Sequence, residues 1–391
     1  MFVATPDSRA GHRIVFANQL RGLAALCVVV DHFIDFYLNA PNVVSAATQL
    51  PTQPGETGGL FYLAAHHWLH FGPFGVAVFF LISGLVIPLS LERYNGATFL
   101  LARIFRIYPT YLATLCLGIG VVWASTFLWG KSLYSPVPTL LANALLLNDV
   151  FGLPSIDLVN WTLCIELKFY LLMALAAPAV RRGSVAILFL IAVGALMATV
   201  AVNAPALAPA MALLPSQAET FVRMIVAESL YLIFMLVGVL FSYHLRGIIS
   251  GRALLGSASL LSAIFAVCWR QSVLAPSFAD VAPSYAFALL VFSLLFAARK
   301  YVRNIRLLDG LAAVSYPLYL VHPLVGFSLL RVLTVGCGMR YALALAVTFP
   351  AVIVLAALTH VAIERWSIAA GHRIAQRGAA ASRQGARFLN A

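Results

Sequence analysis

Long apolar runs recur along the whole chain, each near the ~20 residues that an α-helix needs to cross a membrane. Short polar stretches separate them. This alternation predicts an all-α, polytopic membrane protein, because helices satisfy their backbone polar groups within a bilayer. We expect about ten transmembrane helices, at residues 17–38, 72–91, 107–128, 160–180, 184–202, 224–243, 253–270, 284–299, 310–330 and 341–363. The apolar segment 139–148 is too short to span, and we expect it to be re-entrant or interfacial.

The basic residues predict the orientation of these spans. If both termini are cytoplasmic, 19 of the 25 Lys and Arg residues fall on the inner side, as the positive-inside rule requires. The first outer loop, residues 39–71, has neither Lys nor Arg and is expected to be an ordered external loop or lid. The predicted organisation is a cytoplasmic tail at 1–16, a membrane domain at 17–366 and a basic cytoplasmic tail at 367–391, solvated or on the membrane surface.

Composition agrees with this class. Hydrophobic residues make up 62% of the chain and charged residues only 10%, against about 25% charged in soluble domains. The net charge of +12 is explained by the positive-inside pattern, so we expect no nucleic-acid partner. The five cysteines form no C-x-x-C pair, so neither a metal site nor a disulfide framework is expected.

The first span, "NQLRGLAALCVVVDHF", carries groups that hydrocarbon disfavours. Arg21 and His32 are 11 residues apart, so they share a helix face about 16 Å apart along the axis. Arg21 is either a snorkelling anchor or a functional group. His32 falls in the outer half of the bilayer, where a histidine is a functional candidate or a hydrogen-bonded core residue. Asp35, at i+3, would orient the imidazole of a general base, with Asp31 as a rival.

The fourth span opens with "NWTLCIELKFY", which places Glu166 a turn or two below the outer surface. Since this is close to the depth expected for His32, the two groups are predicted to share a polar cavity. Trp161 is expected at the interface, as a belt tryptophan or a substrate-binding residue. Lys168 points about 160° away from Glu166 on the helix, which favours a snorkelling or structural role.

The ninth span holds "VSYPLYLVHPL". Tyr316, Tyr319 and His322 are spaced by three and form a polar stripe on one side. Pro317 and Pro323 would bend this helix and free backbone carbonyls. The stripe either joins helices together or lines a substrate path.

Two further motifs lie in and after the second span. Ser83 and Gly84, in "FFLISGLVIP", favour close helix packing. Arg103 and Arg106, in "ARIFRIYPTY", stand one turn apart on the cytoplasmic side. They either reflect topology alone or form a clamp for the phosphates of a donor such as an acyl-coenzyme A. The sequence has no Walker loop, zinc-ligand spacing or G-x-S-x-G elbow.

Five motifs in this order resemble those of the membrane acyltransferase type 3 family, integral-membrane enzymes that O-acylate sugars and similar acceptors. They are "LRGLAALCVVVDH", "FFLISGLV", "RIFRIYP", "NWTLCIELKFY" and "VSYPLYLVH", and the resemblance covers residues 16–366. Thr162 replaces the serine usual in the fourth motif. The chain also departs after the last span, where Glu364 is followed by Arg365 and Trp366 instead of Lys-Pro.

The resemblance implies an acyl donor, usually acetyl-CoA, which approaches from the cytoplasm near Arg103 and Arg106. It implies that His32 is the catalytic base or an acyl relay, supported by Arg21 and Glu166. The acceptor would be a hydroxyl of a cell-surface or exported glycan, with Tyr319 and His322 along its path. The extra hydrolase-like domain of some family members is absent from this sequence.

Such an enzyme would act in the lipid bilayer of a bacterial inner membrane, within a glycan-biosynthesis complex or alone. Other functions fit the same sequence. Buried ionisable groups and proline-broken helices also mark transporters or flippases of a glycan or acyl precursor. An accessory subunit of a glycan-export complex, and an enzyme that O-acylates a small secreted molecule such as an antibiotic, are the remaining alternatives.

Overall fold

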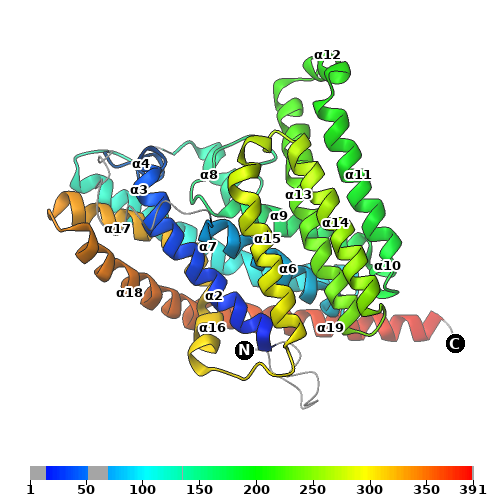
Figure 1. Cartoon of the computed structure of the whole chain (residues 1–391). Helices are drawn as coiled ribbons and strands as arrows, with labels where there is room; N and C mark the ends of the chain where they lie inside the picture. The colour runs from blue at the N-terminus through cyan, green and yellow to red at the C-terminus, as the bar shows by residue number, and fades with distance from the viewer. Residues whose placement is uncertain (1–14, 52–68, 134, 390–391) are drawn as a thin grey trace.

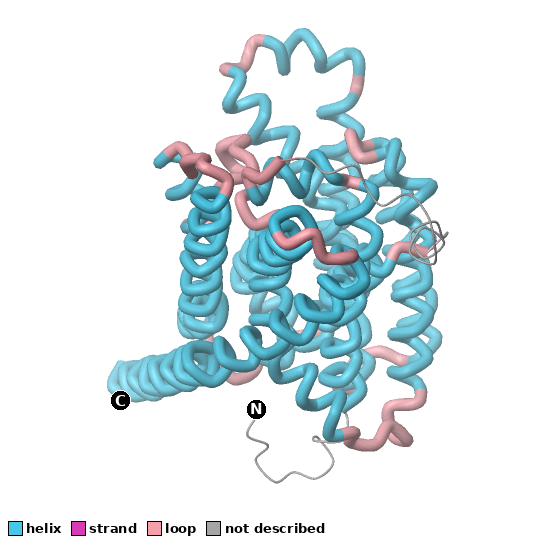
Figure 2. Tube along the Cα trace, turned by 90° about the vertical axis from the view of Figure 1, so that its left-hand side faces the viewer, coloured by secondary structure: helices cyan, strands magenta, loops and turns pink. Residues whose placement is uncertain are grey.

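The computed structural model describes residues 15–51, 69–133 and 135–389, with side chains up to residue 377. These residues form helices and loops, with no strand among them (Figure 2). Nine helices of the described part are long and apolar enough to cross a membrane, which confirms the all-α polytopic class. Part of the predicted outer loop 39–71 lies outside the described residues.

The helices that frame the molecule begin and end as follows (Figure 1): α2 (Val15–Asp31), α4 (Pro41–Thr48), α6 (Phe71–Leu91), α7 (Gly96–Leu128), α8 (Val137–Ala144), α9 (Asn160–Leu175), α10 (Ala177–Arg181), α11 (Val185–Asn203), α12 (Ala208–Ala212), α13 (Ser216–Leu245), α14 (Gly251–Gln271), α15 (Phe278–Ala297), α16 (Arg306–Val321), α17 (Phe327–Arg331), α18 (Tyr341–Thr359) and α19 (Arg365–Leu389). Four π-helical segments interrupt or extend them: His32–Phe36, His322–Gly326, Val332–Gly336 and His360–Glu364.

The predicted fourth span, 160–180, differs from a simple transmembrane helix. It forms α9, whose 16 residues extend about 24 Å, short of the ~30 Å hydrocarbon core, followed by the separate α10. Helix α9 also begins inside the protein, because Asn160 is fully buried. The segment 139–148 holds the end of the short α8 and the turn after it, so it does not span, as predicted.

Small residues bring the central helices into close contact. A Cβ at Gly84 on α6 would lie 2.1 Å from the carbonyl oxygen of Met235 on α13. A Cβ at Gly238 on α13 would lie 2.4 Å from the carbonyl oxygen of Leu81. The two backbones therefore touch through glycine, which confirms the close packing expected at Ser83 and Gly84.

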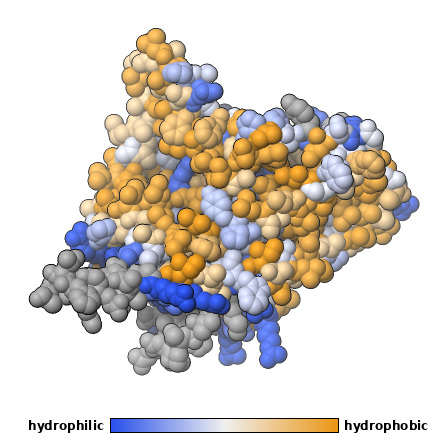
Figure 3. All heavy atoms as spheres, turned by 180° about the vertical axis from the view of Figure 1, so that it is seen from behind, coloured by the Kyte–Doolittle hydropathy of each residue, from blue (hydrophilic) through white to orange (hydrophobic). Residues whose placement is uncertain are grey.

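The face that Figure 3 shows is mostly apolar, with hydrophilic side chains gathered at its lower edge and smaller groups of them near the top. Large apolar side chains such as Phe127, Leu190 and Leu294 are exposed on the described helices, as expected of helices that face lipid. Helix α19 lies across one end of the bundle, the same end as the start of α2 (Figure 1). It packs on α7, where a Cβ at Gly371 would lie 2.6 Å from the Cβ of Phe105.

Candidate active site

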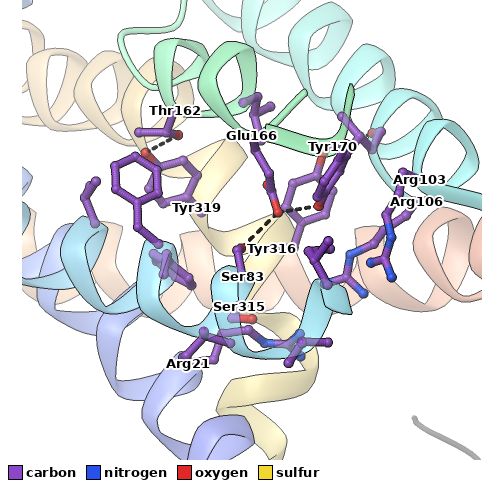
Figure 4. A pocket seen from close by; sticks show the side chains of 18 of the residues that line it. Arg21, Ser83, Arg103, Arg106, Thr162, Glu166, Tyr170, Ser315, Tyr316 and Tyr319 are labelled. Carbon is purple, nitrogen blue, oxygen red and sulfur yellow. Dashed lines mark hydrogen bonds between the residues drawn. The ribbon is translucent and has the colours of Figure 1, made fainter. Parts of the chain in front are cut away.

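A cavity of about 130 Å³ lies between α2, α6, α7, α9 and α16. Arg21, Arg103, Arg106 and Glu166 all contribute to its wall, and Figure 4 shows them together with Tyr170. Most of the remaining wall is apolar, from α6 above all. The structure therefore brings together three of the predicted basic residues from two helices that are distant in sequence.

The arginines keep much of their hydrogen-bonding capacity. Arg21 donates through one terminal nitrogen to the carbonyl oxygen of Ala312, at 2.9 Å, while its buried Nε has no partner. Arg103 donates to Ser90 Oγ, and its Nε is likewise buried and unpaired. The guanidinium group of Arg106 makes no hydrogen bond within the described chain. Together they give the cavity an excess of positive charge and several N–H groups available to an anion.

Glu166 belongs to this cavity and not to the surroundings of His32. Its carboxylate accepts hydrogen bonds from Ser83 Oγ, at 3.2 Å, and from Tyr170 Oη. His32 is not part of the cavity wall, so the predicted shared cavity of Glu166 and His32 is wrong. Glu166 instead faces Ser83 on α6 and Tyr170 on its own helix.

His32 instead pairs with His322. The Nδ1 atom of His32 lies 2.9 Å from Nε2 of His322, and the His322 side chain is fully buried. Each histidine is the first residue of a π-helical segment, at the ends of α2 and α16. Single π-helical turns within α-helices occur often at functional sites, because they redirect side chains relative to a regular helix.

The hydrogen bonds of His322 determine which nitrogen of His32 carries a proton. His322 Nδ1 lies 3.1 Å from the carbonyl oxygen of Leu318, which can only accept, so Nδ1 must donate. In a neutral imidazole the other nitrogen then accepts, so His32 Nδ1–H donates to His322 Nε2. This leaves the lone pair of His32 Nε2 available, as a general base requires.

Asp35 does not orient His32 as predicted. Its carboxylate lies 3.3 Å from His70 Nδ1 and accepts from the side-chain amide of Asn39. The partner that orients His32 is His322, because the π-helical turn carries Asp35 away from the imidazole. Asp31, Asp35 and His70 form a group whose ligand-type atoms lie within 4.8 Å of one another.

Tyr319 connects the cavity with the histidine pair. It lines the cavity wall together with Thr162, and their hydroxyl oxygens are 2.9 Å apart. The centroid of its ring lies 5.9 Å from that of His322. On its other side, the ring meets Phe79 edge to face at 5.7 Å. One end of the cavity therefore reaches the side chain next to the histidine pair.

The remaining predicted residues divide between the cavity and the core. Tyr316 lines the cavity and donates to the carbonyl oxygen of Ile107, at 3.0 Å. Trp161 lies outside the described wall and packs on the Tyr231 ring of α13, with centroids 5.5 Å apart. Trp161 is partly buried in this contact, and the interfacial or substrate-binding position expected for it stays a prediction.

Lys168 points away from the cavity, as predicted. Its ammonium group pairs with both Asp149 and Glu228, whose side chains are buried. This is a structural link between α9, α13 and the loop ahead of α9. No motif in the sequence points to these two acids or to Tyr170, although Tyr170 lies four residues after Glu166 and so on the same helix face.

A bundle of membrane-spanning helices around a basic cavity and a partly buried histidine pair fits an integral-membrane group-transfer enzyme. The chain matches the acyltransferase domain family over residues 14–361, and it belongs to that family. It is also similar to a protein named acyltransferase MdmB from Streptomyces mycarofaciens, at 29% identity over 275 residues, which cover 66% of this chain and 68% of the relative. No solved structure matches the chain significantly. The protein is thus a multi-pass membrane acyltransferase.

Proposed function

We propose that this enzyme transfers an acyl group, most simply acetyl, from a cytoplasmic acyl-coenzyme A to a hydroxyl group of a cell-surface or exported glycan. The observation that carries the proposal is the 2.9 Å contact between His32 Nδ1 and His322 Nε2, since the tautomer inferred from it leaves the lone pair of His32 Nε2 available. The basic cavity, whose end reaches Tyr319 beside this pair, supports a phosphate-bearing donor.

The cavity fits the chemistry of such a donor. Arg21, Arg103 and Arg106 outnumber the single carboxylate of Glu166 in its wall, and two Nε atoms are buried without partners. Guanidinium groups present forked N–H donors to phosphate oxygens. The apolar remainder of the wall suits the uncharged arm that carries the thioester. Arg21 and His32 are about 16 Å apart along α2 and its extension, so such an arm would link the two sites.

In the proposed reaction, His32 Nε2 takes the proton of the acceptor hydroxyl while the oxygen attacks the thioester carbonyl. The new C–O ester bond forms, the C–S bond breaks, and the proton passes to the departing thiolate sulfur. His322 holds the imidazole of His32 and spreads the positive charge that develops on it. General-base help of this kind typically accelerates reactions ~10²–10⁴-fold.

The donor side is proposed to face the cytoplasm of a bacterium, with the enzyme in the inner membrane and both termini inside. The basic end of α2 and the arginines of α7 support this orientation through the positive-inside rule. A glycan is the proposed acceptor because of the type 3 resemblance. A small secreted molecule with a hydroxyl group is a second candidate acceptor. The shape of the acceptor pocket would decide between the two.

The test uses the purified protein in proteoliposomes with radiolabelled acetyl-CoA and a panel of glycan and small-molecule hydroxyl acceptors. Wild type should transfer label, and His32→Ala should not, while inserting normally. Arg106→Ala should raise the KM for the donor, because Arg106 offers an unpaired guanidinium group. Full activity of His32→Ala would contradict the proposal, and acceptor movement without donor consumption would favour a transporter. Label that stays on wild type without acceptor, and does not stay on His32→Ala, would show that the acyl group passes through His32.

A further inference from the structure

Glu166 shares the cavity wall with three arginines, yet it pairs with none of them. In the part of the chain that the structure describes, no nitrogen of Arg21, Arg103 or Arg106 lies within 4.0 Å of its carboxylate oxygens. A carboxylate and a guanidinium group in a poorly solvated cavity attract each other strongly. Some other contact must therefore hold Glu166 in place.

Two hydroxyl groups supply that contact, as the dashed lines in Figure 4 show. Tyr170 Oη and Ser83 Oγ both donate to the same oxygen, Oε1, of Glu166. Tyr170 is four residues after Glu166 on α9, so the two side chains lie on one helix face. Ser83 reaches the carboxylate from α6, on the facing side of the cavity.

The Tyr170 ring is itself fixed between other groups. It meets the Phe99 ring edge to face, with centroids 5.9 Å apart. The guanidinium carbon of Arg103 lies 5.5 Å from the Tyr170 centroid and 5.2 Å from that of Phe99. One side chain therefore binds the carboxylate of Glu166 with its hydroxyl group and lies against Arg103 with its ring.

We infer that Tyr170 is a positioning residue, which prevents Glu166 from neutralising the cavity arginines and so keeps them available to the phosphates of the donor. This inference rests on the proposed function. An internal carboxylate that reached Arg103 or Arg106 would compete with a phosphate for the same N–H groups. With Glu166 bound to two neutral hydroxyl donors, the arginines keep the unpaired nitrogens described above.

The test measures coenzyme A binding to detergent-solubilised full-length protein by calorimetry. Tyr170→Phe removes the hydroxyl group and keeps the ring, so Glu166 can turn toward the arginines, and affinity should fall about ten- to a hundredfold. Adding Glu166→Gln to Tyr170→Phe removes the competing charge, so affinity should return close to that of wild type. Tyr243→Phe is the matched control, because it deletes a buried hydroxyl group that has no partner and lies outside the cavity. Its affinity should equal that of wild type.

The outcomes separate the inference from the proposed function. No coenzyme A binding by wild type would overturn the proposed function itself. Wild-type binding with unchanged affinity in Tyr170→Phe would overturn the inference alone. A loss that Glu166→Gln does not restore would also overturn it, because Tyr170 would then act on the arginines directly. If Tyr170→Phe does not fold, Ser83→Ala takes its place, because it removes the second hydrogen bond to Glu166. Coenzyme A affinity is then measured for Ser83→Ala alone and for Ser83→Ala combined with Glu166→Gln.

Discussion

His322 Nε2 lies 2.9 Å from His32 Nδ1, although the two histidines are 290 residues apart in sequence. Each stands where its helix changes from α to π geometry. The bond joins the extensions of α2 and α16, and the ring of Tyr319, which lines the cavity, lies beside His322. His322 is fully buried and holds the imidazole of His32, as the proposed role of His32 as a catalytic base requires.

Replacing His322 with Ala should lower kcat by about 10²- to 10⁴-fold, because His32 would lose the acceptor that fixes its tautomer. His322→Gln is the informative comparison, since its side-chain oxygen can take the place of Nε2 and accept from His32 Nδ1. It should retain more activity than His322→Ala. Steady-state kinetics of both variants check this, and equal losses would show that His322 acts through packing alone.

Asp35→Asn should leave kcat near the wild-type value, because Asp35 contacts His70 and Asn39, not His32. An exposed or half-exposed pair of this kind contributes little to stability as well. The measurement is the same acyl-transfer assay, with His32→Ala as the inactive reference. A loss approaching that of His32→Ala would mean that Asp35 reaches the imidazole during turnover.

Sequence reasoning identified most of the residues around the site, for a clear physical reason. Charged and hydrogen-bonding groups in apolar spans are costly, so Arg21, His32 and Glu166 stand out against their surroundings. Helical spacing likewise anticipated that Lys168 would point away from Glu166. The five motifs, which carry the resemblance to a family, point to the same residues.

Pairing between helices was harder to predict, because it depends on the depth at which each helix starts. The sequence predicts Glu166 near His32 only if the helix that carries Glu166 begins at the outer surface. Asn160 is buried instead, and its amide donates to the side-chain oxygens of Asn143 and Asn148, within a polar network ahead of α9. The π-helical turn after Asp31 similarly changes the directions that an ideal helix assigns to His32 and Asp35.

Gly84→Ala and Gly238→Ala should both prevent proper folding. The added Cβ would lie 2.1 Å from a carbonyl oxygen of the facing helix at Gly84 and 2.4 Å from one at Gly238. Because the atoms in contact belong to the backbone, the clash is relieved only if α6 and α13 move apart. The loss in folding free energy should exceed that of ordinary overpacking in a core, which is about 1–3 kcal/mol. Gly256→Ala on α14 is the control, because no atom lies within 4 Å of its added Cβ. Size-exclusion profiles in detergent distinguish them, and a monodisperse Gly84→Ala protein would contradict this account.

Asp157, in the loop ahead of α9, predicts a pH dependence of stability. Its Oδ1 accepts from the backbone N–H groups of Asn160, at 2.9 Å, and Val159, at 3.2 Å. Burial nevertheless raises the pKa of Asp157 from 3.8 to about 6, against the effect of these hydrogen bonds. The folded protein therefore holds this proton between about pH 4 and pH 6, where the unfolded chain has lost it. This contribution to stability is complete below about pH 4 and is lost as pH rises through about 6.

Asp157→Asn keeps an oxygen that can accept the same two N–H groups but carries no charge at any pH. The variant should match wild type near pH 4 and exceed its stability by about 3 kcal/mol at pH 7, the equivalent of the pKa shift. Thermal unfolding of both proteins across this pH range gives the difference in their stability at each pH. All other titrating groups are the same in the two proteins, so their effects cancel in this difference. Parallel curves would show that the Asp157 carboxyl keeps its ordinary pKa, and that its backbone hydrogen bonds offset the whole effect of burial.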